Sequence, residues 1–245
     1  MHLKVIIGNL AENQAKVFYK PALDLRFKFI IGAVREKQCI SYIIPHDSGK
    51  APNPWWNNLT LGVCKPVIRR TAEENDLIVG LSFRGQRLVY VMYVAEILTF
   101  GEYFHDPRFY LKKPNFVSND SRRWMGDNFY EPTGKAYIQH VSPHHVQNRT
   151  QIELQRLMDI DLSGLNVLVA SLFWYFGDFG PELPEELSFL RIRRGHRLSG
   201  ERGMLAVERY VKVLLGNPGI HGMPKLFNET AQKLKHLHGQ KQAKA

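Results

Sequence analysis

The stretch DLIVGLSFRGQRLVYVMYV, residues 76–94, decides the fold class. Two apolar, β-branched runs at 76–83 and 88–94 flank the glycine-bearing turn Arg84-Gly85-Gln86, which is the pattern of a β-hairpin. The second run is almost entirely apolar, so we expect it to be buried within a sheet. A hairpin with a buried member needs further strands beside it.

The flanking sequence supplies these strands. Apolar runs at 39–44, 59–63 and 166–176 are typical of strands. The segment 49–60 between the first two carries Pro52 and Pro54, and we expect a loop there because proline cannot donate to a central ladder. Residues 111–150 show no clear periodicity, and a stretch that long is usually functional or wrapped on a partner.

Helices are expected on either side of the strands. Thr99 and Glu102 form a capping box that starts a helix, and Asp106-Pro107 ends it. Residues 201–215 have apolar side chains at helical spacing. Because strands and helices do not alternate as βαβ units, we predict an α+β fold with a mixed or antiparallel, barrel-like sheet and flanking helices.

The chain length allows one large domain with an extension. We expect a single domain over residues 1–228, in which residues 1–39 form an N-terminal extension packed on a core of about 40–225. Within the extension, 3–7 and 27–34 are expected as strands and 10–19 as a helix. After Glu229 the chain has four lysines and no acid, which predicts a basic, flexible tail at 229–245.

The chain carries 33 Lys and Arg against 23 Asp and Glu, a formal charge of +10. Such an excess attracts polyanions, so DNA or a nucleotide is the expected partner, with a small anionic substrate as the alternative. No membrane partner is expected, because no run approaches the ~20 apolar residues that span a bilayer. The two cysteines form no framework and the N-terminus is no signal peptide, which favours the cytoplasm.

Two basic runs are candidate phosphate sites. In the run 65–70, the cations Lys65, Arg69 and Arg70 follow a strand, although the same run could be a solvated turn with ion pairs to nearby glutamates. The run 191–197 is the densest positive segment; Arg194 and His196 in it favour a nucleic-acid contact over a solvated face.

Aromatic and polar loop residues are candidate base contacts. Trp55 and Trp56 could stack on bases while Asn53 reads a base edge, or one indole could plug the end of the barrel. Loops on a rigid sheet often hold sites. A further group of candidates therefore lies at the end of the expected helix 99–104 and in the loops after it: Tyr103, Asp106, Arg108, Asp127 and Asn128.

The run 140–145 has three histidines, but their spacing matches no zinc motif, so we expect no metal. His144 is instead a candidate acid, base or phosphate contact. The chain also lacks the glycine-rich nucleotide loops, the zinc protease motif and the hydrolase elbow, and we expect no cofactor.

Several short motifs resemble the second family of nucleotide-modification-associated domains. The most specific are Lys65-Pro66-Val67-Ile68-Arg69-Arg70 and Asp106-Pro107-Arg108-Phe109, and further matches extend over roughly residues 40–225. The resemblance implies a place in systems that modify, or respond to modified, bases in phage or bacterial DNA. The order of loop, strand, hairpin and aspartate–proline turn also resembles, more loosely, PUA-like and EVE domains, which hold modified bases in a barrel pocket.

Two functions follow as expectations. In the first, the chain binds a modified base or nucleotide between Trp55 or Trp56 and a polar wall of Asp47, Asn53 and Asn128, while arginines neutralise phosphate. In the second it is a transferase or hydrolase acting on a nucleotide or base, with Asp47 or Asp106 as general base and His144 or His196 as acid. A third reading is a subunit that assembles with partner proteins of a base-modification system.

Overall fold

The computed structural model describes residues 35–147, 149–214 and 216–242. The strands and helix expected before residue 35, and most of the extension at 1–39, lie outside the described residues. A compact unit begins at Glu36.

A six-stranded mixed sheet is the centre of this unit, with the strand order β10-β1-β3-β4-β9-β11. β3 and β4 form the expected hairpin, with Val79 opposite Val91, and β1 runs parallel to β3. The strands are β1 (Cys39–Ile43), β3 (Leu77–Leu81), β4 (Leu88–Tyr93), β9 (Phe173–Tyr175), β10 (His196–Leu198) and β11 (Gly219–Ile220).

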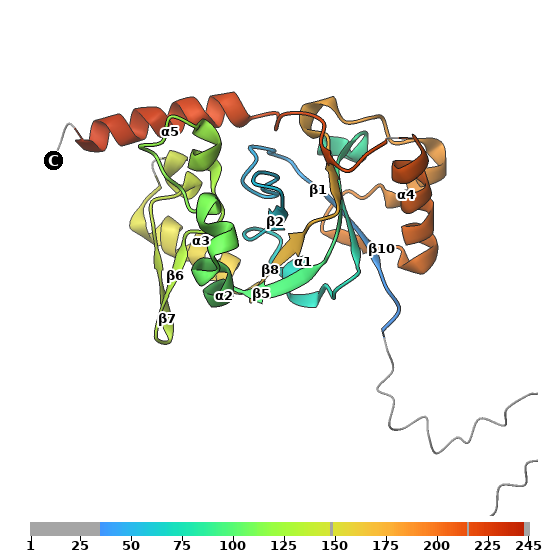
Figure 1. The fold of residues 1–245 in the computed structure, drawn as a ribbon, viewed down its shortest axis with the longest axis horizontal. Coiled ribbons are helices and arrows are strands. Elements are labelled where there is room, and N and C mark those ends of the chain that lie inside the picture. Colours follow the sequence, from blue (N-terminus) through green and yellow to red (C-terminus); the bar gives the residue numbers. More distant parts are fainter. Residues whose placement is uncertain (1–34, 148, 215, 243–245) are drawn as a thin grey trace, which may run out of the picture. The chain divides into compact units, whose positions relative to one another are not determined.

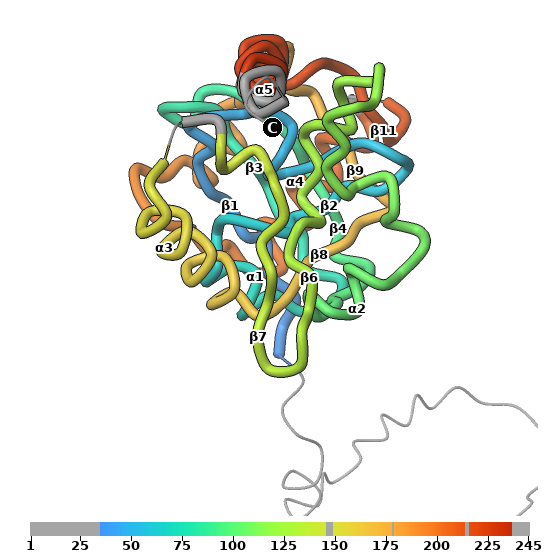
Figure 2. The backbone as a smooth tube through the Cα atoms, turned by 90° about the vertical axis from the view of Figure 1, so that its left-hand side faces the viewer, coloured from blue at the N-terminus to red at the C-terminus, as the bar shows by residue number. Residues whose placement is uncertain are grey.

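A second, three-stranded sheet has the order β2-β8-β5 and packs against one face of the first. Its strands are β2 (Leu59–Leu61), β5 (Glu96–Thr99) and β8 (Asn166–Ala170). The core between the two sheets contains Tyr42, Tyr90 and Tyr175 together with aliphatic side chains. A separate hairpin of β6 (Tyr130–Thr133) and β7 (Ala136–Gln139) projects from the body (Figure 2).

Helix α4 (Gly200–Leu214) covers the opposite face of the six-stranded sheet, so that the sheet lies between α4 and the strands β2, β8 and β5 (Figure 1). Val207 and Val211 of α4 are fully buried against that face. The remaining helices are α1 (Pro66–Thr71), α2 (Phe100–His105), α3 (Gln151–Leu162) and α5 (Phe227–Gln242).

The strand expected over 166–176 is two strands that belong to different sheets. β8 pairs with β2 and β5, whereas β9 pairs with β4 and β11. The chain crosses between the sheets at Ser171 and Leu172, which are exposed. Sequence periodicity misses this break because both strands are buried and apolar.

The expected barrel is not found. In the described part of the chain, β10 and β11 are the two edges of the six-stranded sheet and do not pair with each other. The fold is a mixed α/β arrangement of open sheets, which agrees with the expected mixed sheet and flanking helices but not with a PUA-like closure.

The segment expected as a flexible tail is instead helix α5, as far as residue 242. Ala231 and Leu234 are buried in a cluster with Trp55, Met125 and Phe227. Of the lysines that suggested a frayed arm, Lys233 and Lys235 are exposed on this helix. The apolar residues of the helix are too few for their spacing to reveal it from sequence.

Shortening Leu234 tests whether α5 is a packed part of the domain. Leu234→Ala removes a side chain that is 3% exposed, so the free energy of unfolding should fall by about 2–5 kcal/mol. Urea unfolding followed by tryptophan fluorescence measures the loss. Lys235→Ala, an exposed change on the same helix, is the control, and equal stability of both variants would show that α5 does not pack.

Candidate functional site

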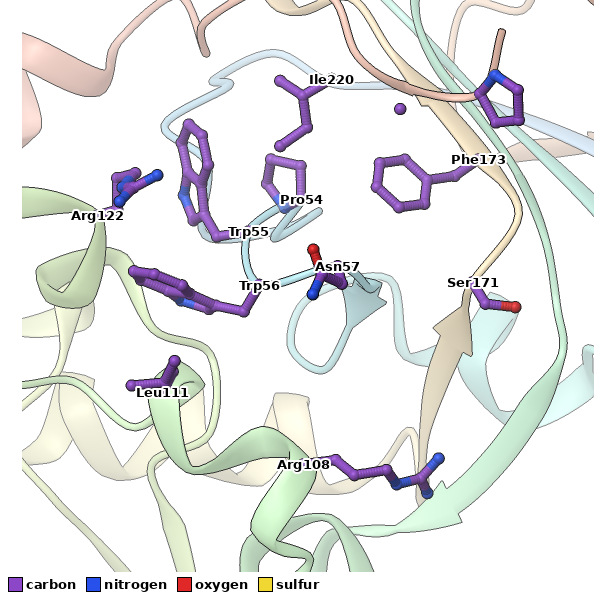
Figure 3. A pocket seen from close by; sticks show the side chains of 12 residues that line it. Pro54, Trp55, Trp56, Asn57, Arg108, Leu111, Arg122, Ser171, Phe173 and Ile220 are labelled. Carbon is purple, nitrogen blue, oxygen red and sulfur yellow. The ribbon is translucent and has the colours of Figure 1, made fainter.

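A cavity of about 790 Å³ opens between the tryptophan loop and the edge of the six-stranded sheet that carries β11. We call it the tryptophan pocket. Figure 3 shows the two indoles on the side of Arg122 and Leu111, with Phe173 and Ile220 across the opening and Arg108 at its lower margin. Its lining residues are Pro54, Trp55, Trp56, Asn57, Arg108, Leu111, Arg122, Ser171, Phe173, Pro218, Gly219 and Ile220.

The two tryptophans have different roles. Trp55 is only 3% exposed and its ring meets Phe227 of α5 edge to face, with centroids 5.6 Å apart. Trp56 is partly exposed, and both it and Asn57 have positive φ angles, 64° and 65°. This left-handed turn sends the two consecutive rings in different directions, so that Trp55 anchors the loop and Trp56 remains available to a ligand.

Both arginines of the pocket are ion-paired. The guanidinium of Arg108 donates to both oxygens of Glu96, at 2.8 Å each, and to Asp106 at 2.7 Å. The guanidinium of Arg122 lies 4.7 Å from the ring centroid of Trp56 and pairs with Asp120 at 2.6 Å. Since neighbouring carboxylates balance these cations, the pocket offers flat apolar surface more than free positive charge.

Lys112 holds the loop that carries the two tryptophans, residues 53–58, by hydrogen bonds to both of its ends. Its ammonium is buried and donates to the backbone and side-chain oxygens of Asn53, at 3.1 and 2.9 Å, and to the carbonyl of Asn58 at 2.8 Å. The side-chain amide of Asn53 in turn donates to the carbonyl of Met125. Burial lowers the pKa of Lys112 to about 7. Both ends of the loop 53–58 are therefore held by one side chain.

Asp127 provides the negative charge that accompanies Lys112. Its carboxylate accepts from Thr60 Oγ1 at 2.8 Å, from the backbone of Gly62 at 3.2 Å and from the hydroxyl of Tyr103 at 2.7 Å. Burial raises the pKa of Asp127, while Lys112 and the hydrogen bonds oppose that rise. This buried polar network links the tryptophan loop to β2 and α2.

A second buried cluster is centred on Asp161 of α3. Its carboxylate accepts from the backbone N–H of Cys64 at 2.6 Å and from the hydroxyl of Tyr130 at 2.9 Å. His144 Nε2 lies 3.3 Å from Asp161 Oδ2, yet neither ring nitrogen makes a hydrogen bond to another described residue. Burial lowers the pKa of His144 to about 2, which keeps the imidazole neutral. The same cause raises the pKa of the Cys64 thiol.

Cys64 occupies a strained link between β2 and α1. It has a φ of 59° and Lys65 a φ of 44°, although neither is glycine. The buried guanidinium of Arg69 holds this link by donating to the carbonyls of Cys64, Asn166 and Asp161. Gly164 permits that placement, since a Cβ there would lie 2.5 Å from the guanidinium carbon.

The structure divides the predicted site residues among several places. Trp55, Trp56 and Arg108 meet in the tryptophan pocket, with Asp106 paired to Arg108 at its margin. The interior holds a second group, which supports loops and strands: Asp47, Asn53, Arg69, Tyr103, Asp127, Asn128 and His144.

Asp47, Lys65 and Arg70 are engaged with partners inside the fold. Both carboxylate oxygens of Asp47 accept from the hydroxyl of Tyr175, at 2.8 and 2.6 Å, whereas His144 lies beside Asp161. The ammonium of Lys65 donates to the carbonyl of Ile43, and Arg70 donates to the carbonyl of Ser163.

The arginine-rich run forms a second hollow of about 620 Å³, the arginine hollow, at the edge of the sheet that carries β10. It is lined by Arg84, Arg191, Ile192, Arg193, Arg194 and Arg197. β10 and β11 are separated by five interstrand spacings, roughly 24 Å at about 4.8 Å each. The arginines of the run 191–197 and the two indoles therefore lie at different edges of the sheet, although the predicted Arg108 does share the tryptophan pocket with the indoles.

Sequence reasoning missed several residues of these sites. Phe173 and Ile220 line the tryptophan pocket from strands that only the fold brings there. Asp161 belongs to a helix that was not expected, although Thr150 and Glu153 form a capping box at its start. That box was a readable signal for α3, whereas no local pattern relates Asp161 to Cys64, which is 97 residues away.

Replacing Lys112 tests whether it holds the tryptophan loop. Lys112→Met leaves Asp127 and three oxygens of the loop without a cation, so the free energy of unfolding should fall by at least about 2 kcal/mol. Urea unfolding measures the loss, and the summed tryptophan emission of the folded chain should shift to longer wavelength as the loop that carries Trp55 and Trp56 loosens. Lys135→Met, an exposed change in the β6–β7 turn, is the control. Equal stability of the two variants would contradict this role.

The depressed pKa of Lys112 predicts a dependence of stability on pH. An unfolded lysine has a pKa near 10.4, and that of the folded protein is about 7. Between these values the unfolded chain binds a proton that the folded chain does not, so stability contributed by this residue rises as pH rises from 7 towards 10. The slope should be smaller in Lys112→Met when unfolding is measured over that range. Identical slopes would place the folded pKa near its ordinary value.

The comparisons with known proteins give one match. The family model described as nucleotide modification associated domain 2 matches residues 36–231. No curated protein and no solved structure matches the chain, so the looser likeness to PUA-like domains gains no support there. No described helix is both long and apolar enough to cross a membrane. Because the family model covers most of the chain, the protein belongs to the nucleotide modification associated domain 2 family.

Proposed function

We propose that this protein recognises a base, in a nucleotide or a nucleic acid, through the tryptophan pocket, as part of a system of nucleotide modification. The observation that carries the proposal is the partly exposed indole of Trp56 in a cavity of about 790 Å³, within the range of small-ligand sites. The family supports the context, because its description associates it with nucleotide modification.

The lining of the tryptophan pocket matches the flat face of a base. Stacking of a base on an aromatic ring contributes about 1–3 kcal/mol. One face of Trp56 is covered by Arg122, so the ligand would enter from the side of Phe173 and Ile220. The exposed amide of Asn57 and the hydroxyl of Ser171 are the polar groups that could distinguish a modified base from an ordinary one.

A base within a duplex has to leave the helix to enter such a pocket. Extrusion costs a few kcal/mol and costs least for a mismatched or single-stranded base. A single stacking contact does not offset that cost for a paired base, which favours single-stranded nucleic acid or free nucleotides as ligands. Partner proteins of a modification system would then supply or consume the base. We place this activity in the cytoplasm, which agrees with two free thiols, Cys39 and Cys64.

An enzyme acting on nucleotides is a second candidate, favoured by the cluster around Asp161. A strained cysteine between a strand and a helix, beside a carboxylate and an unpartnered imidazole, is an arrangement found at catalytic sites. In the observed conformation the thiol and the imidazole are both neutral and the ring nitrogens are buried, so binding is the better supported function. Conversion of the bound nucleotide, followed by mass spectrometry, would favour catalysis.

Removing the indole of Trp56 tests the proposed binding. Trp56→Ala should weaken the binding of nucleoside monophosphates by at least about fivefold, which corresponds to the lower limit of one stacking contact. Isothermal titration calorimetry with ordinary and 5-hydroxymethylated deoxycytidine monophosphate measures both affinity and preference. Ile152→Ala, which shortens an exposed apolar side chain on α3 outside the pocket, is the control. Unchanged affinity of Trp56→Ala would sink the proposal.

A further inference from the structure

Five arginines line the arginine hollow, and all five are exposed. Arg191 has a distant ion pair to Glu185, at 3.8 Å, and Arg197 donates to the carbonyl of Phe189 at 2.8 Å. Arg193 and Arg194 make no hydrogen bond or ion pair with another described residue. These cations contrast with Arg108 and Arg122 of the tryptophan pocket, whose charges are balanced by carboxylates at 2.6–2.8 Å.

The fold holds these arginines together although they come from distant segments. Arg84 lies in η2 (Phe83–Gly85), the turn between β3 and β4, with a φ of 69°. The loop with Arg191 packs against this turn, since a Cβ placed on Gly85 would lie 3.7 Å from Cγ of Arg191. Arg197 lies on β10, where it is opposite Ser41 of β1. Like charges gathered by a rigid sheet repel one another, and a ligand with several negative charges relieves that repulsion.

An aromatic ring stands beside these cations. Phe83 is 65% exposed, and the guanidinium of Arg84 lies 5.7 Å from its ring centroid. Most of the ring of Phe83 is therefore open to a ligand. Cationic grooves combined with exposed aromatic rings are the common design of surfaces that bind single-stranded nucleic acid, because the cations contact phosphates while bases stack on the rings.

We propose that the arginine hollow and Phe83 bind the phosphate backbone of single-stranded nucleic acid, with one base stacked on the ring of Phe83. A single phosphate would engage only part of a hollow of about 620 Å³, whereas several successive phosphates suit its five guanidinium groups. The phosphates of a duplex could also bind the arginines. The bases of a duplex are already stacked on one another, however, so none would be available to stack on Phe83. The surface is separate from the tryptophan pocket, and the inference does not rest on the function proposed for that pocket.

The test measures binding of a fluorescein-labelled oligodeoxythymidylate to the whole chain by fluorescence anisotropy over a series of salt concentrations. The double variant Arg193→Ala/Arg194→Ala should reduce the slope of log affinity against log salt by up to about 1.4, since each lost phosphate contact on a single strand removes about 0.7. Phe83→Ala should weaken binding by at least about fivefold and leave the slope unchanged, because stacking releases no counterions.

Two comparisons make the result specific. Arg209→Ala removes an exposed arginine on α4 that does not line the hollow and should change neither affinity nor slope. A duplex of the same length should bind more weakly than the single strand and should not respond to Phe83→Ala. All the replaced side chains are exposed, and circular dichroism checks that the variants fold.

Three outcomes would overturn the inference. A wild-type slope in the double arginine variant would show that the hollow does not contact phosphates. If Arg209→Ala lowered the affinity and the salt slope as much as the double variant does, the effect would come from net charge and not from the hollow. Tighter binding of the duplex with no effect of Phe83→Ala would assign the hollow to another class of ligand. Failure of Trp56→Ala to alter nucleotide binding leaves these measurements unaffected, so the two proposals fail separately.

Discussion

The buried ammonium of Lys112 is the contact on which the tryptophan pocket depends. Loop 53–58 has few backbone partners of its own apart from the bridge between Asn53 and Thr60. Three oxygens of this loop converge on one lysine, and Asp127 lies close enough to act on its charge. A lysine buried in this way is costly, and the cost is tolerable only because each donor has an acceptor. The hydrogen bonds from Lys112 to the loop therefore fix the positions of the Trp55 and Trp56 rings.

Arginine has two opposite roles in this fold. Arg69 is fully buried and its donors are used by three backbone carbonyls, so it stabilises the link between β2 and α1. Arg193 and Arg194 are exposed and available to a ligand. Sequence alone gives no means of separating the two classes, because each lies in a short basic run. Burial and hydrogen-bond partners separate them: of the two basic runs expected to contact phosphates, 65–70 holds the buried Arg69, whereas 191–197 keeps its arginines exposed.

Short sequence patterns correctly predicted the elements that depend on neighbouring residues, such as hairpins and helix caps. The hairpin of β3 and β4, strand β1 and the capping box at Thr99 are all present as the sequence indicated. Long-range arrangement was predicted less well, since the expected barrel is an open sheet and the expected tail is α5. Polar residues such as Asn53 and Asp127 looked like ligand contacts because their partners, Lys112 and Tyr103, are distant in sequence. Only the folded chain shows that these groups satisfy one another.

The two hollows differ in the way their charges are balanced, and this difference separates their roles. In the tryptophan pocket a ligand phosphate would compete with Glu96, Asp106 and Asp120 for guanidinium groups that are already paired. A neutral base meets no such competition, so salt should have little influence on its binding. In the arginine hollow, where the one described carboxylate paired with a lining arginine, Glu185, lies 3.8 Å from Arg191, the proposed strand would displace mainly counterions. Its binding should therefore depend steeply on salt. One chain can thus combine recognition of a base with retention of a strand at two independent edges of the same sheet.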